Sequence, residues 1–335
     1  MSKTKITERL ANGKTLLMDG GTGSELQRRG VEVLKGATDR LKAWSATCNI
    51  EFSDVVQQVH RDYLRVGAEL IISNNFWTTP SRLSRVGLAD RWEEYARAAG
   101  QNALAARATE NPAAYVAGGI GAPTLQKPVY ESVDEASKRK ERPDVENMGV
   151  EPFRKEYVDH ARLLADLGVD LILAEYIGFI ADAVAAADAC AEAELPVFLG
   201  IRHIDQEGNL QFGESLNKLA EALKGHPVDA VLLMCSDPKA ISIGLPKLLD
   251  AFDGPVGAYP NIGYNPTGPI SHKSRLTNLR PSTGPDIIQL ENYSPSRLAE
   301  FAQEWKEMGA QIIGGCCASG PEHIMAMRHI VKDNT

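Results

Sequence analysis

The sequence of 335 residues contains only five cysteines, an odd number that is unevenly spaced along the chain. Proteins that depend on disulfides are usually short, secreted and rich in paired cysteines. Cytosolic proteins keep their thiols reduced and use them as metal ligands or catalytic groups. The scarcity of cysteine therefore argues against a disulfide framework and predicts a cytoplasmic protein. It does not yet say what the five thiols do.

Long apolar runs and an excess of positive charge are also missing. No apolar stretch approaches the roughly 20 residues that cross a bilayer, and residues 1–14 are too polar for a secretory signal. The chain has 36 basic and 44 acidic residues, a formal net charge of -8, and its only lysine-dense stretch is interleaved with acids. We therefore expect neither nucleic acid nor a membrane surface as a partner, while a homo-oligomer is compatible with the sequence.

What the sequence does contain is a regular alternation of two patterns. Continuous apolar runs, typical of parallel strands buried on both faces, occur at 15–19, 68–75, 113–121, 169–176, 196–202, 228–236, 254–261 and 310–317. Amphipathic helical segments occur at 53–67, 152–167, 180–193, 215–224, 239–252 and 295–308. Ser53 is the expected N-cap of the first of these helices. Ser294, followed by Pro295, marks the start of the last.

This alternation predicts an α/β protein, a (β/α)8 TIM barrel formed by residues 1–335 as a single domain. A doubly wound open sheet with an additional domain is the alternative. Two polar segments, 126–150 and 261–286, are too long for simple connections. In a barrel both would be rim loops at the carboxyl ends of the strands, where binding function is concentrated.

Three of the five cysteines fall at the ends of expected strands. Cys235 ends the sixth strand, and Cys316 and Cys317 end the eighth. The carboxyl ends of barrel strands meet at one rim, and three protein ligands with one open position are typical of a catalytic zinc site. The alternative is that these thiols are small apolar packing residues. We assign that role to Cys48 and Cys190 and favour a metal site for the other three.

Several sequence segments point to a known family. The segment GGCCASGPEHI at 314–324 is the most specific, combined with the single upstream Cys235. Weaker matches follow in order: LLMDGGTGSELQRRG at 16–30, WSA at 44–46, VHRDYLRVGAELIISNNF at 59–76, VDLILAEY at 169–176 and GAYPNIG at 257–263. Together they resemble the homocysteine S-methyltransferase family over nearly the whole chain.

The resemblance implies a TIM barrel that binds zinc through three cysteines, here Cys235, Cys316 and Cys317. It also implies an enzyme that transfers a methyl group from a cationic sulfonium or quaternary ammonium donor to homocysteine, which gives methionine. A coordinated zinc holds a thiol as thiolate at neutral pH, so the sulfur of homocysteine becomes the nucleophile. Two reactants held on one rigid rim gain further from proximity.

Polar residues at strand ends are the candidates for binding homocysteine. By resemblance Glu175 holds the amino group, a charge-assisted contact, although pairing with Arg202 is an alternative. Asp19 is a second candidate, or it caps the next helix. Gly20 and Gly21 are small enough for backbone N–H groups to approach a ligand carboxylate. Asn261 contacts substrate or supports a turn.

Aromatic residues at two strand ends are the candidates for binding the donor. Phe76 and Trp77 end the second strand and Tyr176 ends the fourth. An aromatic face attracts a cationic methyl group, although packing is the alternative role for Trp77 and Tyr176. The family often has Thr-Asn-Thr-Phe where this chain has Asn74, Asn75 and Phe76, so its donor is not settled by resemblance.

Other functions were weighed against this one. Histidine pairs with metal-ligand spacing are missing, and His60 is expected to be a packed helix residue. A zinc barrel hydrolase is therefore disfavoured. A zinc subunit that acts with a corrinoid-carrying partner is the other alternative. Among donors, S-methylmethionine, S-adenosylmethionine, betaine and sulfonium osmolytes all fit, and we favour a sulfonium.

Overall fold

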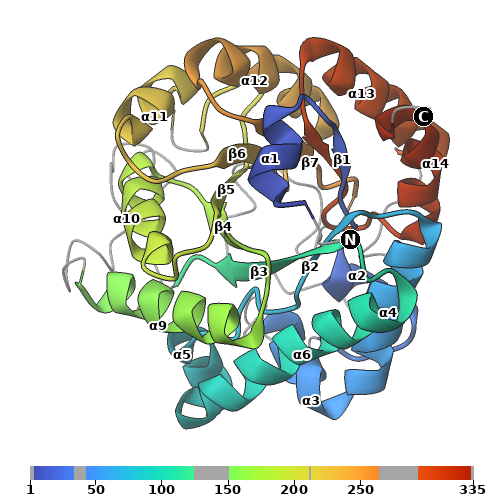
Figure 1. Cartoon of the computed structure of the whole chain (residues 1–335), viewed down its shortest axis with the longest axis vertical. Coiled ribbons are helices and arrows are strands. Elements are labelled where there is room, and N and C mark those ends of the chain that lie inside the picture. The colour runs from blue at the N-terminus through green and yellow to red at the C-terminus, as the bar shows by residue number, and fades with distance from the viewer. Residues whose placement is uncertain (1–3, 34–42, 124–150, 211–212, 264–292, 333–335) are drawn as a thin grey trace.

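Eight parallel strands form the centre of the protein (Figure 1). The computed structural model describes residues 4–33, 43–123, 151–210, 213–263 and 293–332. The strands lie in the order β1-β8-β7-β6-β5-β4-β3-β2, and a parallel bridge between Met18 and Leu70 joins the two ends. The strands are β1 (Leu16–Leu17), β2 (Leu70–Ile72), β3 (Tyr115–Gly121), β4 (Leu171–Ile177), β5 (Val197–Arg202), β6 (Ala230–Met234), β7 (Val256–Tyr259) and β8 (Ile312–Ile313). The sheet is therefore a (β/α)8 barrel.

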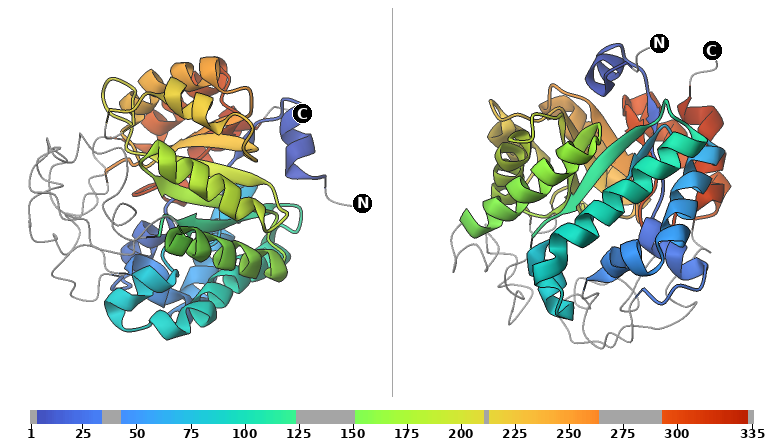
Figure 2. Two further views of the ribbon diagram at one scale, coloured as in Figure 1. Left: turned by 90° about the vertical axis from the view of Figure 1, so that its left-hand side faces the viewer. Right: turned by 60° about the horizontal axis from the view of Figure 1, so that its bottom comes forward.

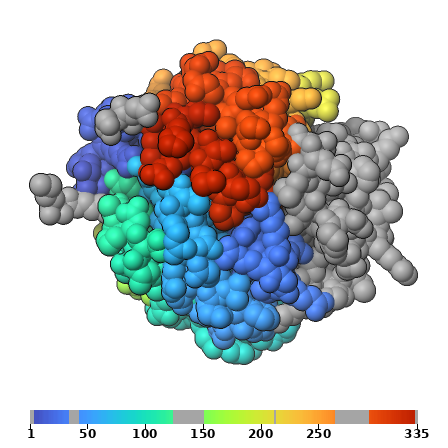
Figure 3. All heavy atoms as spheres, turned by 90° about the vertical axis from the view of Figure 1, so that its right-hand side faces the viewer, coloured from blue at the N-terminus to red at the C-terminus, as the bar shows by residue number. Residues whose placement is uncertain are grey.

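Helices surround this barrel (Figure 1). The longer ones are α4 (Ser53–Val66), α6 (Trp92–Glu110), α9 (Glu151–Leu167), α10 (Ile180–Ala191), α11 (Leu216–Leu223), α12 (Pro238–Ala251), α13 (Pro295–Met308) and α14 (Pro321–Val331). Shorter elements are α1 (Ile6–Ala11), α2 (Thr22–Arg28), η1 (Trp44–Thr47), α3 (Cys48–Glu51), α5 (Pro80–Leu83), η2 (Ser84–Val86) and η3 (Ala89–Arg91). The ring closes where α14 packs beside α4, as Figure 3 shows on the surface.

One helix lies at an end of the barrel instead of on its side. In Figure 2, α1 projects from the end of the molecule near the start of the chain. Its apolar residues Ile6 and Leu10 are buried in the same cluster as the side chains that fill the barrel interior. This helix therefore covers the amino-terminal end, which leaves the carboxyl ends of the strands for the functional residues.

Side chains alternate along each strand between the barrel interior and the helices. On β4, Leu171 and Leu173 belong to the interior cluster, while Ile172 and Ala174 pack under the helices. On β5 the interior position is Phe198. The same alternation places Glu175 and Arg202 on the interior side at the carboxyl ends of β4 and β5.

The predicted fold is confirmed, and each expected strand overlaps one of the eight observed strands. Every predicted range is longer than the observed strand, and β4 continues one residue past its predicted end, to Ile177. The start of α13 is also confirmed, because the Ser294 hydroxyl accepts a hydrogen bond from the Arg297 N–H at 3.2 Å. The prediction for Ser53 was wrong. Phe52 occupies the N-cap position of α4, and the Ser53 hydroxyl instead donates to Asn102 Oδ1 at 2.7 Å.

Some predictions are not tested by the structure. The expected rim loop at 126–150 and most of the one at 261–286 lie outside the described residues. That residues 1–335 form a single domain stays a prediction. Within the described ranges, every helix is too short or too polar to cross a lipid bilayer.

Candidate metal and substrate site

Three sulfur atoms meet at the carboxyl ends of β6 and β8. The Sγ atoms of Cys235 and Cys317 are 3.7 Å apart, and those of Cys316 and Cys317 are 3.8 Å apart. All three lie within 4.8 Å of one another, close enough to hold one metal ion. Cys48 and Cys190 are not part of this group and are fully buried among apolar residues. The structure thus separates the five cysteines as expected.

Local backbone geometry brings the three thiols together. Cys235 follows β6 with φ of 45°, a left-handed conformation that is unusual for a residue with a side chain. Gly314 and Gly315 lead from β8 to the other two cysteines. A side chain at either glycine would collide, with Met18 at position 314 and with Ser319 at position 315. These glycines therefore allow the cysteine loop to lie directly against the end of β1.

If all three thiols were deprotonated, their negative charges would repel one another. Hydrogen bonding with Cys235 is the main cause that raises the pKa of Cys316 and of Cys317 well above the usual thiol value. Burial raises both further. Three thiolates this close need a cation between them, and a bound cation reverses the direction of these shifts. The donor set is therefore suited to a thiophilic metal ion.

Two carboxyl groups lie inside the rim beside the thiols. Asp19 is fully buried and Glu175 is 5% exposed. Burial, followed by a smaller effect of the Cys235 charge, raises the pKa of Glu175 to about 8. Burial is also the main cause that raises the pKa of Asp19 well above its usual value, and the charge of Glu175 adds to it. Two poorly solvated carboxyl groups favour a cationic ligand between them.

Hydrogen bonds within the protein fix both carboxyl groups. Tyr259 donates its hydroxyl proton to Glu175 Oε1 at 3.0 Å. Asp19 Oδ2 accepts from the Ile72 N–H at 2.9 Å, while its Oδ1 is buried with no hydrogen-bond partner in the described part of the chain. Neither alternative role is found there: Asp19 does not cap α2, and no ion pair joins Glu175 to Arg202.

Gly20, Gly21 and Asn261 have clear structural functions. A side chain at Gly20 would collide with the carbonyl of Ser319. The Gly21 N–H donates to the same carbonyl at 3.0 Å, so it is already used within the protein. Asn261 Oδ1 accepts from the Gly263 N–H at 3.1 Å, which supports a turn. Contact of these three residues with substrate stays a prediction.

The expected aromatic group is present next to the carboxyl groups. The ring of Phe76 stacks on Trp77 with centroids 4.9 Å apart and meets Tyr176 edge-on at 5.5 Å. Trp77 is only 5% exposed, and the Arg82 guanidinium lies 3.7 Å from its ring centroid. Trp77 thus already holds a cation that belongs to the protein. Phe76 and Tyr176 are less enclosed, although Arg202 lies over one face of Tyr176 at 4.1 Å from the ring centroid, so Phe76 is the better surface for a donor.

Strained backbone is concentrated on this rim. Tyr176 near the end of β4, His203 after β5 and Cys235 after β6 have φ of 67°, 55° and 45°. Each left-handed conformation of this kind costs about 1–3 kcal/mol and is typical of functional sites. At Tyr176 it coincides with an irregularity in the pairing of β4 with β5. Three neighbouring strands thus end in a conformation that directs a side chain into the site.

Sequence analysis missed residues that support the site. Tyr259, which holds Glu175, was not among the expected site residues. Arg202 was considered only as a partner of Glu175, yet its guanidinium carbon lies 4.1 Å from the ring centroid of Tyr176. His203 Nε2 is 3.1 Å from the Tyr176 hydroxyl. The alternation of interior positions along β5 is the signal that could have identified Arg202 as an inward residue.

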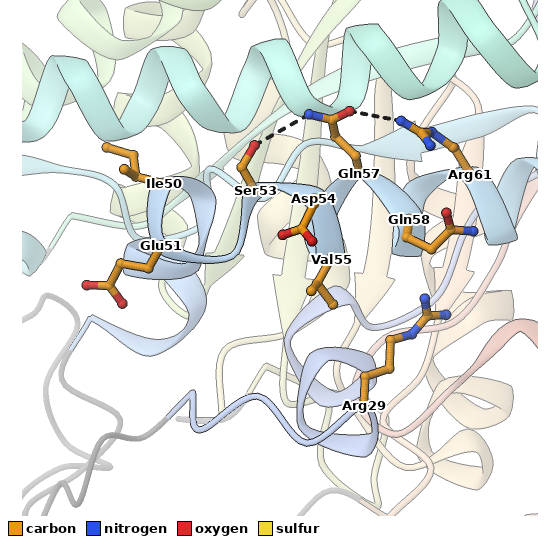
Figure 4. Close-up of a pocket in the computed structure, with 9 residues that line it drawn as sticks. All are labelled: Arg29, Ile50, Glu51, Ser53, Asp54, Val55, Gln57, Gln58 and Arg61. Atoms are coloured by element: carbon orange, nitrogen blue, oxygen red, sulfur yellow. Dashed lines mark hydrogen bonds between the residues drawn. The ribbon is translucent and has the colours of Figure 1, made fainter.

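A separate hollow lies on the outside of the barrel (Figure 4). It has a volume of about 700 Å³ and is lined by residues near the start of α4, with Arg29 from the end of α2. Its polar groups already bind one another: Gln57 joins Ser53 and Arg61, and Arg29 pairs with Asp62 at 2.8 Å. None of the expected site residues lines it. We therefore place the functional site at the rim.

Comparison with known proteins agrees with this arrangement. Residues 16–331 match the family model described as homocysteine S-methyltransferase. The chain is 28% identical to a homocysteine S-methyltransferase of Escherichia coli K12, over 93% of this chain and 94% of that protein. It is 27% identical to homocysteine S-methyltransferase 4 of maize, over 96% and 90%. A selenocysteine methyltransferase of Astragalus bisulcatus is 24% identical over 99% and 97%.

Solved structures confirm the fold. The homocysteine methyltransferase MmuM of Escherichia coli has been solved in a metallated and an oxidised form. The TM-scores are 0.71 and 0.73, each with 24% identity and with more than nine-tenths of both chains covered. Family match, fold and the position of the cysteine cluster lead to one conclusion: this chain is a methyltransferase that belongs to the homocysteine S-methyltransferase family.

Proposed function

We propose that this protein is a zinc-dependent enzyme that transfers a methyl group from a cationic donor to homocysteine and so forms methionine. The observation that carries the proposal is the cluster of Cys235, Cys316 and Cys317 at the rim of the barrel. Membership of the family supports methyl transfer to homocysteine. The identity of the metal and the class of donor are the parts that we add.

Zinc fits the three sulfur atoms. Zinc binds thiolates tetrahedrally at about 2.3 Å, which separates neighbouring sulfur atoms by about 3.8 Å. The observed separations of 3.7 and 3.8 Å agree with this value. Three protein ligands leave one tetrahedral position for a substrate sulfur. When bound, zinc stabilises that sulfur as a thiolate at neutral pH, and three thiolate ligands keep it nucleophilic.

The residues of the chain bind and orient the amino acid. We assign Glu175 and Asp19 to the amino group of homocysteine, because both are buried carboxyl groups next to the cysteine cluster. Tyr259 keeps Glu175 in place through its hydrogen bond. Gly20, Gly21 and Asn261 belong to the same proposed substrate site as supporting residues. Burial of the site excludes water from the substrate thiolate and strengthens each of these contacts.

The aromatic residues receive the donor. Phe76 and Tyr176 offer ring faces, which attract a cationic methyl group, and Trp77 stacks on Phe76. In the transfer, a new S–C bond forms to the homocysteine sulfur as the donor S–C bond breaks. The electron pair of the broken bond stays on the donor sulfur, which becomes a neutral thioether. The proton of the homocysteine thiol is released to solvent on binding.

We also propose that residues 1–335 act as one barrel domain, with rim loops at 126–150 and 261–286 beside the site. This agrees with the family match over 16–331.

A turnover screen tests the proposal. Purified zinc-loaded protein is mixed with homocysteine and, separately, with S-methylmethionine, S-adenosylmethionine, betaine or dimethylsulfoniopropionate, and methionine is quantified. We expect methionine with a sulfonium donor and none with the metal-free Cys316→Ala variant. Methionine from no donor would contradict a free-standing enzyme. If methionine then forms on addition of a methylated corrinoid protein, a subunit function replaces the proposal.

A further inference from the structure

Arg202 occupies a position that the proposed reaction has not yet used. It is the last residue of β5 and pairs in register with Met234, the residue before the metal-site residue Cys235. Its guanidinium lies 4.1 Å from the ring centroid of Tyr176. The Tyr176 N–H in turn contacts the Met234 sulfur at 3.0 Å. Arg202 is therefore part of the rim between the aromatic group and the cysteine cluster.

Within the described part of the chain, no acidic side chain neutralises the charge of Arg202. In the ranges that the structure describes, no carboxylate lies within ion-pair distance of this guanidinium. The acid at the end of the neighbouring strand, Glu175, is bound to Tyr259 instead. The Nε atom of Arg202 is buried and has no hydrogen-bond partner among the described residues. A partly buried guanidinium without an anion is unfavourable, so its position suits a ligand that supplies one.

We infer that Arg202 binds the carboxylate of the methyl donor and so selects a zwitterionic donor over a purely cationic one. The inference rests on the proposed function and names the donor class for the same site. A donor that carries only positive charge would be repelled by Arg202 and has no carboxylate to offset that repulsion. A zwitterion places its carboxylate against Arg202 and its methylated cation against the ring of Phe76, beside Tyr176.

The location of Arg202 favours the donor over homocysteine as the source of the carboxylate. Arg202 contacts Tyr176, which belongs to the aromatic group through its edge contact with Phe76 at 5.5 Å. The amino acid end of homocysteine is assigned to Asp19 and Glu175. Asp19 lies at the end of β1, four strands away from β5 in the barrel order, and Glu175, although it lies on the strand next to β5, is hydrogen-bonded to Tyr259 of β7. The carboxylate of the donor would then lie at the end of β5, and the carboxylate of homocysteine at another part of the rim.

Gly178 holds the guanidinium in this position. A Cβ atom at residue 178 would lie 3.0 Å from Arg202 Nε and 3.3 Å from its Nη2, closer than ordinary contact. The side chain of Arg202 thus packs between the backbone of Gly178 and the ring of Tyr176. Gly178→Ala would push the guanidinium away without removing its charge. This variant therefore tests whether the position of the guanidinium matters, because the arginine itself is retained.

The test measures binding by calorimetry on zinc-loaded protein. The ligands are S-methylmethionine and dimethylsulfoniopropionate, each beside its carboxamide, in which a neutral group of similar size replaces the carboxylate. Loss of a charge-assisted hydrogen bond weakens binding by about 10- to 150-fold. We expect Arg202→Gln to raise the Kd of the better-binding carboxylate donor by that factor. The Kd values of its carboxamide and of homocysteine should stay within threefold of those of the unaltered protein. Gly178→Ala should also raise the Kd of the carboxylate donor. The control Arg162→Gln, an exposed residue paired with Glu192, should change none of these.

Three results would overturn the inference: equal binding of carboxylate and carboxamide by the unaltered protein, loss of homocysteine affinity in Arg202→Gln, or unchanged donor affinity in that variant. The first needs no variant, so the inference remains testable if Arg202→Gln does not fold. Turnover separates the two proposals. Binding that depends on Arg202 without any methionine would contradict the proposed function alone, while equal turnover of carboxylate and carboxamide donors would contradict this inference alone.

Discussion

The amino group of homocysteine is the first contact to test, through Glu175→Gln. This change keeps the size of the side chain and an oxygen that accepts from Tyr259, and it removes only the negative charge. A charge-assisted hydrogen bond in an enclosed site contributes about 1.5–3 kcal/mol. Because Glu175 is 5% exposed, solvent screens the contact little. We therefore expect the Kd for homocysteine to rise by about 10- to 150-fold.

The variant should fold, because burial already disfavours the charged carboxyl group. The pKa of Glu175 is raised from 4.5 to about 8, so this carboxyl group favours folding below pH 4.5 and loses that contribution as the pH rises through 8. At pH 8 a neutral glutamine is expected to be at least as stable as glutamate. Thermal unfolding at pH 8 checks this before any affinity is compared.

The assay is calorimetric titration of zinc-loaded protein with homocysteine, together with measurement of the zinc content. Glu69→Gln is the matched control, since Glu69 pairs with Arg9 at 2.8 Å just before β2, at the opposite end of the barrel. The expected result is full zinc content in both variants and weak homocysteine binding only in Glu175→Gln. A Kd within threefold of the unaltered protein, with zinc bound, would refute the assignment of Glu175.

Three further changes test other parts of the account. Cys316→Ala should bind less than a tenth of the zinc held by the unaltered protein, by elemental analysis, while the buried control Cys48→Ala keeps it; equal zinc in both would contradict the ligand set. His60 is fully buried with a pKa lowered by burial to about 4, so its contribution to stability is present above pH 6.5 and is lost as the pH falls to 4. In urea unfolding, His60→Leu should remove about 3 kcal/mol from the change in unfolding free energy between pH 6.5 and pH 4. If the unfolding free energy of the variant depends on pH as it does in the unaltered protein, the pKa of His60 is not lowered. Gly121→Ala would force its new methyl group into the Phe76 carbonyl, so we expect a loss of about 1–3 kcal/mol in stability and weaker donor binding; an unaltered melting temperature would contradict this packing.

The sequence allowed the barrel to be predicted because its strands are buried on both faces and therefore appear as continuous apolar runs. It did not reveal where the strands begin and end, since buried apolar residues continue beyond the hydrogen-bonded part of each strand. Val169 and Ala310, for example, are buried yet lie before β4 and β8. The burial of apolar residues and the pairing of strands are different properties, and the pattern of apolar residues in the sequence predicts only burial.

The cysteine cluster was predictable because the barrel topology places the ends of the strands that carry these three cysteines at one rim. Arg202 and Tyr259 were not assigned roles, because their partners depend on side-chain directions at the rim. The left-handed conformation of Tyr176 turns its ring toward Arg202, and nothing in a tyrosine predicts a positive φ. Ser53 was misassigned for a similar reason, since Asn102 on α6 competes for its hydroxyl.

The central claim is that Cys235, Cys316 and Cys317 hold a zinc ion with one position left for the sulfur of homocysteine. X-ray absorption at the zinc edge, with and without homocysteine, tests it most directly because it counts the sulfur atoms bound to the metal. The account predicts three sulfur ligands at about 2.3 Å in the protein alone and four after homocysteine is added. A count that stays at three with saturating homocysteine would contradict it.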